Sequence, residues 1–192
     1  MFADKLIDSI KEKGNNPTII GLDPTLEYIP DGIKTKYFEK YHDDRLKAAG
    51  KAMFEFNKGI IDSTYDLVAA VKPQLAYYEM YGINGLKAYL KTIQYCNEKG
   101  LLVVTDGKRN DIGSTASAYS AAYLEENALF ESDALTVNGY LGIDGIKPFI
   151  DDCEDYDKGI FVLVKTSNKS SGDIQDLELG DGRKIYELNS KS

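Results

Sequence analysis

Short runs of apolar residues alternate along the chain with longer amphipathic segments. Runs of this kind that end in polar residues are typical of buried parallel strands, and we predict strands at residues 18–23, 67–72, 101–106, 134–138 and 159–165. Between them apolar residues recur at every third or fourth position, the pattern of helices that bury one face. This pattern predicts helices at 46–61, 81–99, 114–127 and 144–152, and the start of another at 184–188.

The alternation of strands and helices predicts a parallel sheet with right-handed crossovers. Chemically useful polar residues fall at the carboxyl ends of different strands, at Asp23, Lys72, Asp106 and Ser167. A (β/α)₈ TIM barrel builds its active site from such positions, so we predict an α/β barrel with residues 1–192 as a single domain. A doubly wound sheet is the alternative, but it binds its ligand beside a glycine-rich first turn, and Pro24 in the segment 21–25 has no N–H for a phosphate.

The number of strands is small for a complete barrel. A (β/α)₈ barrel has eight strand–helix units in typically about 250 residues, whereas this sequence has 192 residues. We count about five units before Ser167. The sequence therefore predicts a partial barrel domain from which the last strand–helix units are missing.

Composition excludes several classes of function. The net charge of −8 argues against nucleic acid or an anionic membrane as partner, because such binding depends on many lysines and arginines. Because His42 is the one histidine, a zinc site with several histidine ligands is excluded. Cys96 and Cys153 are expected to be buried reduced thiols. No apolar run approaches the ~20 residues that span a bilayer, so we expect a cytoplasmic protein.

The most informative segment follows the third predicted strand and contains Asp106, Lys108 and Asp111. Lys72, at the end of the second strand, adds a cation at the same mouth of the barrel. These four residues can form an array of alternating charge, in which each opposite neighbour offsets the cost of desolvation. The alternative is a solvated loop with surface ion pairs.

The spacing Asp106-x-Lys108-x-x-Asp111 with an upstream Lys72 resembles the charged tetrad of orotidine 5′-monophosphate decarboxylases. The surrounding sequence is similar to the longer bacterial subgroup of that family, and the similarity covers essentially the whole chain. The stretches that carry it are Gly21–Pro24, Val71–Gln74, Asp106–Thr115 and Thr166–Asn168.

The resemblance implies an activity and roles for the tetrad. Orotidine 5′-monophosphate is decarboxylated to uridine 5′-monophosphate, with neither a metal nor an organic cofactor. Asp106 lies beside the substrate carboxylate, Lys108 protonates the ring carbon as carbon dioxide leaves, and Lys72 links the array and reaches the ribose.

The resemblance also implies roles for residues around the tetrad. Asp23 binds the ribose hydroxyls, and Ser167 forms a hydrogen bond with the pyrimidine ring. Asp111 and Thr115 act in the neighbouring subunit's site, which makes the expected assembly a homodimer with shared active sites.

One part of the family pattern has no counterpart in this sequence. The elements that grip the substrate phosphate, including a late arginine, follow the seventh and eighth strands of the family, and nothing here matches them. Three alternatives therefore remain open. A magnesium-dependent sugar-phosphate decarboxylase of the same superfamily conflicts with the cation Lys72, which repels a metal. A Schiff-base aldolase requires a neutral Lys72 or Lys165. A fragment that only binds or dimerises is the third.

Overall fold

A computed structural model describes residues 1–190, apart from the side chain of Asn189. Five parallel strands form one sheet, and their order in space is the order of the chain. In a doubly wound sheet the order of the strands reverses at a switch point. In a (β/α) barrel each strand lies beside the one that precedes it in the chain. All five predicted strands are confirmed: β1 (Ile19–Leu22), β2 (Ala70–Pro73), β3 (Leu102–Arg109), β4 (Ala134–Asn138) and β5 (Gly159–Leu163).

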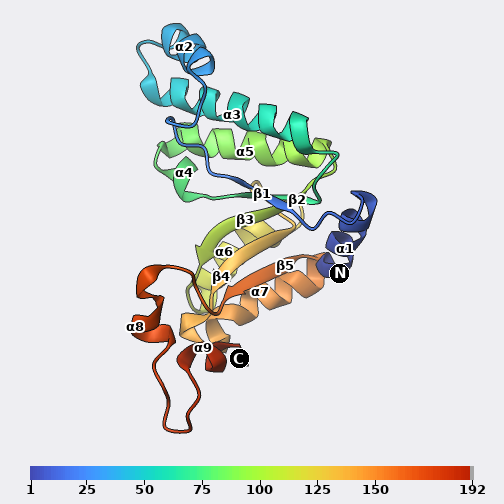
Figure 1. The fold of residues 1–192 in the computed structure, drawn as a ribbon, viewed down its shortest axis with the longest axis vertical. Coiled ribbons are helices and arrows are strands. Elements are labelled where there is room, and N and C mark those ends of the chain that lie inside the picture. The colour runs from blue at the N-terminus through green and yellow to red at the C-terminus, as the bar shows by residue number, and fades with distance from the viewer. Residues whose placement is uncertain (191–192) are drawn as a thin grey trace.

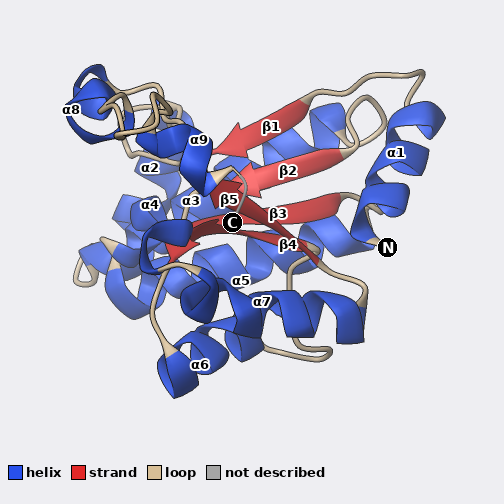
Figure 2. Cartoon of the chain, turned by 90° about the horizontal axis from the view of Figure 1, so that it is seen from below, coloured by secondary structure: helices blue, strands red, loops and turns tan. Residues whose placement is uncertain are grey.

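Helices that connect successive strands cover one face of this sheet (Figures 1 and 2). Each of the four predicted crossover helices is confirmed to within a few residues: α3 (Arg45–Thr64), α5 (Gly82–Glu98), α6 (Gly113–Leu124) and α7 (Ile143–Tyr156). The predicted helical start near the end of the chain is α9 (Ile185–Asn189). The remaining helical segments were not predicted: α1 (Phe2–Glu12), α2 (Asp31–Lys40), α4 (Ala76–Glu79), η1 (Gly139–Leu141), η2 (Lys169–Ser171) and α8 (Gly172–Gln175).

Helix α1 lies at the amino ends of the strands (Figure 2). Its Phe2 is buried against Val104 and Ala134. A Cβ atom on Gly159, the first residue of β5, would lie 2.3 Å from the Phe2 ring, so only glycine lets the ring pack here. Helix α1 thus closes the end of the sheet that is opposite to the predicted site.

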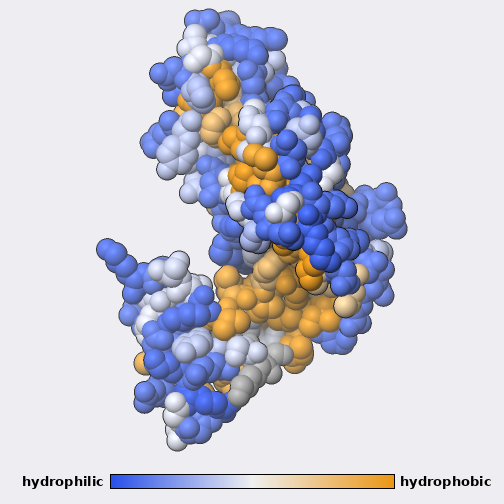
Figure 3. Space-filling model, turned by 45° about the vertical axis from the view of Figure 1, so that its right-hand side comes forward, coloured by the Kyte–Doolittle hydropathy of each residue, from blue (hydrophilic) through white to orange (hydrophobic). Residues whose placement is uncertain are grey.

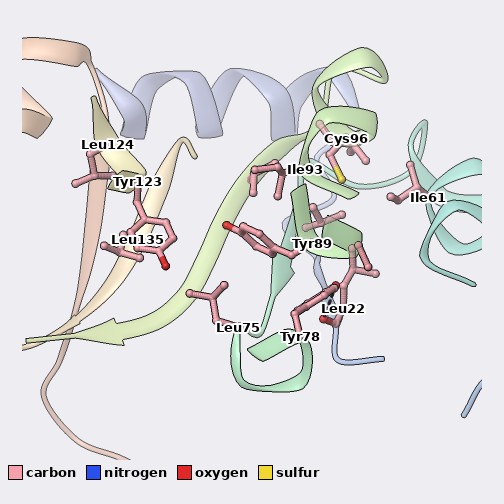
Figure 4. Packing of buried hydrophobic residues seen from close by; sticks show 14 of the residues in the cluster. Leu22, Ile61, Leu75, Tyr78, Tyr89, Ile93, Cys96, Tyr123, Leu124 and Leu135 are labelled. Atoms are coloured by element: carbon pink, nitrogen blue, oxygen red, sulfur yellow. Dashed lines mark hydrogen bonds between the residues drawn. The ribbon is translucent and has the colours of Figure 1, made fainter. Parts of the chain in front are cut away.

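The main core lies between the sheet and its helices, and two buried tyrosines span it (Figure 4). The Tyr78 hydroxyl accepts a hydrogen bond from the side-chain amide of Asn57 at 2.8 Å, and the Tyr89 hydroxyl pairs with the Thr105 hydroxyl at 2.6 Å. Both rings are fully buried, so they pack within the core and are not open to a ligand. Buried hydroxyls with partners of this kind fix one arrangement of the core.

Exposed apolar side chains gather around β5, the last described strand of the sheet (Figure 3). Phe161 and Val162 are 42% and 38% exposed. Between β5 and α7 lies a hollow of about 300 Å³, lined mainly by aliphatic side chains such as Ile146, Ile160 and Val162. Cys96 is buried in α5 and Cys153 is half-buried in α7; both are free thiols, as predicted. No helix within residues 1–190 has the length and apolar character needed to cross a membrane.

Two helical glycines allow a matched test of this packing. A Cβ atom on Gly85 in α5 would lie 1.8 Å from the Tyr78 carbonyl oxygen, while a Cβ atom on Gly59 in α3 meets nothing within 4 Å. We expect Gly85→Ala to lower the free energy of unfolding by about 1–3 kcal/mol or more, because backbone atoms must move. Gly59→Ala should raise it by about 0.5–1 kcal/mol through helix propensity. Urea unfolding measures both, and equal effects would contradict the close α4–α5 contact.

Candidate active site

A bulge in β3 places the central charged residues. Thr105 pairs with Leu135 of β4, yet the next pair joins Arg109 to Val137, so three residues of β3 face Thr136 alone. Lys108, within the bulge, has a left-handed φ of +47°. Such a conformation costs a non-glycine residue about 1–3 kcal/mol and is retained where the surroundings enforce it. Bulges at strand ends re-aim side chains beside active sites.

The Asp106 carboxylate is the centre of the site, with only 4% of the residue exposed. Its Oδ2 accepts a hydrogen bond from Lys72 Nζ at 2.8 Å, and its Oδ1 accepts one from Lys108 Nζ at 2.6 Å. The two ammonium groups thus hold opposite oxygens of one carboxylate. The structure therefore brings three of the four predicted tetrad residues together.

Two further residues donate hydrogen bonds to Asp106, and neither was predicted from the sequence. The Thr136 hydroxyl donates to Asp106 Oδ1 at 2.8 Å and accepts the Lys108 backbone N–H at 3.0 Å. The side-chain amide of Gln74 donates to Oδ2 at 3.0 Å. Gln74 lies at the carboxyl end of β2, and this position was the available signal for it, whereas Thr136 lies inside β4.

The hydrogen bonds decide the charge of Asp106. Burial alone would raise its pKa, because a low dielectric disfavours the carboxylate. The hydrogen bonds from Lys108, Lys72 and Thr136 outweigh burial and hold the pKa of Asp106 below its ordinary value. The group is therefore a carboxylate at neutral pH, enclosed but fully paired.

Asp23 lies on the loop after β1, within electrostatic range of this cluster. Loss of water around its carboxylate is the largest cause that raises the pKa of Asp23, and the attraction of Lys72 opposes it. The residue remains exposed to solvent as a whole. Its carboxylate is thus open to a ligand that approaches the carboxyl ends of the strands.

Within the described chain, no hydrogen bond or ion pair joins Asp111, Thr115 or Ser167 to the Asp106 cluster. Asp111 Oδ1 accepts the N–H of Ile112 at 2.8 Å, and among residues 1–190 Asp111 forms no ion pair. Helix α6 begins two residues later without a side-chain cap, so Asp111 does not cap it. Thr115 is exposed on the first turn of α6, and Ser167 is exposed on the loop after β5.

A shallow hollow of about 290 Å³ adjoins the charged cluster. Lys72, Asp106, Lys108 and Thr136 supply its polar side, and Ile19, Val104, Phe161 and Leu163 supply its apolar side. Cations and one buried carboxylate beside an apolar wall suit an anionic ligand with a flat, weakly polar part. Within the described part of the chain no group of three or more histidines, cysteines and carboxylates is placed to hold a metal ion.

Together these features define an α/β protein whose parallel strands carry a charged site at their carboxyl ends, as in barrel enzymes. A family model described as the orotidine 5′-phosphate decarboxylase / HUMPS family matches residues 18–192, and the chain belongs to this family. The resemblance seen in the sequence is thereby confirmed.

Two curated relatives illustrate the similarity. The orotidine 5′-phosphate decarboxylase of Caldicellulosiruptor saccharolyticus is 46% identical over 202 residues, covering 97% of this chain and 65% of the relative. That of Clostridium tetani is 44% identical over 191 residues, covering 100% of this chain and 62% of the relative. The chain thus spans somewhat less than two thirds of the length of these relatives.

The fold is similar to that of solved structures in the same way. The structure of Leishmania donovani OMP decarboxylase matches with a TM-score of 0.76 and 33% sequence identity, over 97% of this chain and 62% of that one. Leishmania donovani UMP synthase matches with a TM-score of 0.75 over 35% of its chain. These neighbours are barrels, which agrees with the barrel order of the strands.

The shared hydroxyl of Thr136 provides a test of the site. In Thr136→Val the pKa of Asp106 should rise toward its ordinary value, and unfolding should become easier by about 1–3 kcal/mol at neutral pH, because the Lys108 N–H loses its acceptor. A lowered native pKa adds stability above the unfolded value of 3.8 that disappears as the pH falls through the native value. The valine variant has less of this stability to lose.

Urea unfolding across the acid range measures this difference, with Thr136→Ser as the matched control because it keeps the hydroxyl. Below about pH 5, where a carboxylate with a lowered pKa begins to lose its contribution, the valine variant should lose stability less steeply than the wild type, and the serine variant should follow the wild type. Identical acid dependence in all three proteins would show that Thr136 does not hold the Asp106 carboxylate.

Proposed function

We propose that the protein decarboxylates orotidine 5′-monophosphate to uridine 5′-monophosphate in pyrimidine biosynthesis. The observation that carries this proposal is the buried Asp106 carboxylate, clamped between the ammonium groups of Lys72 and Lys108. The family also includes the HUMPS branch, so family membership alone leaves the substrate open. Relatives that are 40–46% identical are orotidine 5′-phosphate decarboxylases, which favours the nucleotide substrate.

Lys108 acts as the proton donor. When the bond between the pyrimidine ring and the carboxylate breaks, its electron pair stays on the ring carbon and carbon dioxide leaves. A fixed ammonium stabilises this charge without rearranging, and preorganised charge of this kind is usually the largest contribution to catalysis. Transfer of one Lys108 proton to that carbon completes the product.

Asp106 faces the substrate carboxylate. Two carboxylates in one enclosed site repel each other, and departure of carbon dioxide removes the repulsion. The repulsion thereby raises the free energy of the enzyme–substrate complex more than that of the transition state, and the activation barrier becomes lower. The hydrogen bonds of Thr136 and Gln74 keep the Asp106 oxygens in place for this step.

The remaining polar residues hold the substrate. Asp23 accepts hydrogen bonds from the ribose hydroxyls, and its exposed position near Lys72 fits that role. Lys72 links the array and reaches the ribose, and Ser167 binds the pyrimidine ring from the loop after β5. No step requires a metal or an organic cofactor, and Lys72 stands where the magnesium ligand of the sugar-phosphate enzymes would lie.

The active form is a homodimer in which each site takes Asp111 and Thr115 from the partner. What supports this is the position of Asp111, which neither caps α6 nor pairs with Lys108 within residues 1–190. Thr115 lies exposed one turn away on the same rim. The two free thiols and the charged nucleotide substrate suit the cytoplasm.

Replacement of the proton donor tests the activity. We expect Lys108→Ala to reduce the rate of carbon dioxide release by more than the 10²–10⁴-fold, roughly, that is typical for loss of a general acid, because the charge is lost as well. Uridine 5′-monophosphate should still bind. Assays in excess chelator separate this reaction from a magnesium-dependent one, and Lys13→Ala, directly after the far helix α1, serves as control. A variant that keeps more than a tenth of the wild-type rate would refute the role of Lys108.

Mixing two inactive variants tests the shared site. If Asp111 serves the partner, a heterodimer of Lys108→Ala and Asp111→Ala subunits places both changes in one site and leaves the other intact. Activity should therefore recover in part after subunit exchange. Exchange is followed separately with differently tagged subunits, and exchange without recovery would mean that each subunit builds its own site.

A further inference from the structure

A second cationic feature lies on the outer layer of helices, away from the Asp106 cluster. The first halves of α3 and α5 border a hollow of about 180 Å³. Four lysines line it, with the ring of Phe54 and the residues Gly50, Asn84 and Ala88 between them: Lys47, Lys51, Lys87 and Lys91. None of the residues that line it belongs to the proposed active site.

The helix packing explains why these lysines converge. A Cβ atom on Gly50 would lie 2.4 Å from the Asn84 carbonyl oxygen, so glycine lets the two backbones approach closely. Lys47 and Lys51 are four residues apart on α3, and Lys87 and Lys91 are four residues apart on α5. Residues at this spacing share one face of a helix. Each helix therefore places one pair of lysines beside the contact between α3 and α5.

The charges of these lysines are not neutralised. The chain carries 31 acidic and 23 basic residues, yet within residues 1–190 none of the four forms an ion pair, and no carboxylate lines the hollow. Lys47 and Lys91 lie over aromatic rings, 4.6 Å from the Tyr41 centroid and 5.7 Å from the Phe54 centroid. The charge of Lys91 is the largest cause that lowers the pKa of Lys51. The cluster is thus repulsive in the free protein.

We propose that this four-lysine hollow is a binding site for a small anion with two or more phosphate groups. Ammonium groups bind phosphate as point charges, and a multiply charged anion converts the repulsion among several of them into attraction. With a volume of about 180 Å³, the hollow has room for a short phosphate chain. Inorganic polyphosphate and nucleoside triphosphates share this chemistry.

Calorimetric titration with inorganic tripolyphosphate at low ionic strength tests the site. We expect one anion per chain, with no displacement by uridine 5′-monophosphate, because the two sites share no residue. Lys51→Gln/Lys91→Gln should weaken binding at least tenfold, and so should Lys47→Gln/Lys87→Gln. The matched control Lys13→Gln/Lys169→Gln removes the same charge elsewhere and should stay within twofold of the wild type.

A second titration with uridine 5′-triphosphate distinguishes the sources of the anion. If its affinity equals that of tripolyphosphate, the site recognises the phosphate chain alone. If its affinity is higher and is lost in the same variants, the site also contacts the nucleoside. Absence of binding at millimolar anion, or an equal loss in the control variant, overturns the proposal. Thermal unfolding of each variant verifies that it is folded.

Discussion

The structure around the site depends on the burial of one carboxylate between two ammonium groups. An isolated buried carboxylate is strongly disfavoured, and removing one partner of a buried pair leaves an uncompensated charge. Asp106 avoids this cost because Lys72, Lys108, Thr136 and Gln74 all donate to its two oxygens. The Asp106 carboxylate therefore stays charged although only 4% of the residue is exposed, while Lys72 and Lys108, with 39% and 46% of their side chains exposed, remain open to a ligand.

The order of the strands follows from the same requirement. The donors to Asp106 come from both sides, with Lys72 and Gln74 at the end of β2 and Thr136 on β4. Only a sheet in which β3 lies between these two strands brings them together. The bulge then places three residues of β3 opposite Thr136. Lys108, with its left-handed backbone conformation, directs its ammonium group to Asp106 Oδ1. The backbone strain at Lys108 is retained because both ends of the residue are held. Its backbone N–H donates to the Thr136 hydroxyl, and its ammonium group pairs with Asp106.

Much of this arrangement could be predicted from local patterns. Lys72, Asp106 and Lys108 were predicted because charged residues at the ends of apolar runs must leave a barrel at its mouth. Thr136 was not, since a threonine inside a strand is also an ordinary strand former. The bulge depends on how two strands pair, which local periodicity does not contain. Helix α2 buries no residue fully, and only Ile33 and Tyr37 pack partly against the core, so its apolar stripe is too short to detect from the sequence.

The two groups of lysines show opposite solutions to the same electrostatic problem. At the sheet, two ammonium groups share a buried carboxylate, so their geometry is fixed before any ligand arrives. On α3 and α5, four lysines face one hollow; among residues 1–190 no carboxylate lines it, and aromatic rings lie beneath two of the lysines. Fixed charges suit a transition state, which needs an environment that does not rearrange. Mobile charges suit binding, because a flexible ammonium can follow an anion that it meets. The difference lies in whether the protein supplies the counter-charge itself.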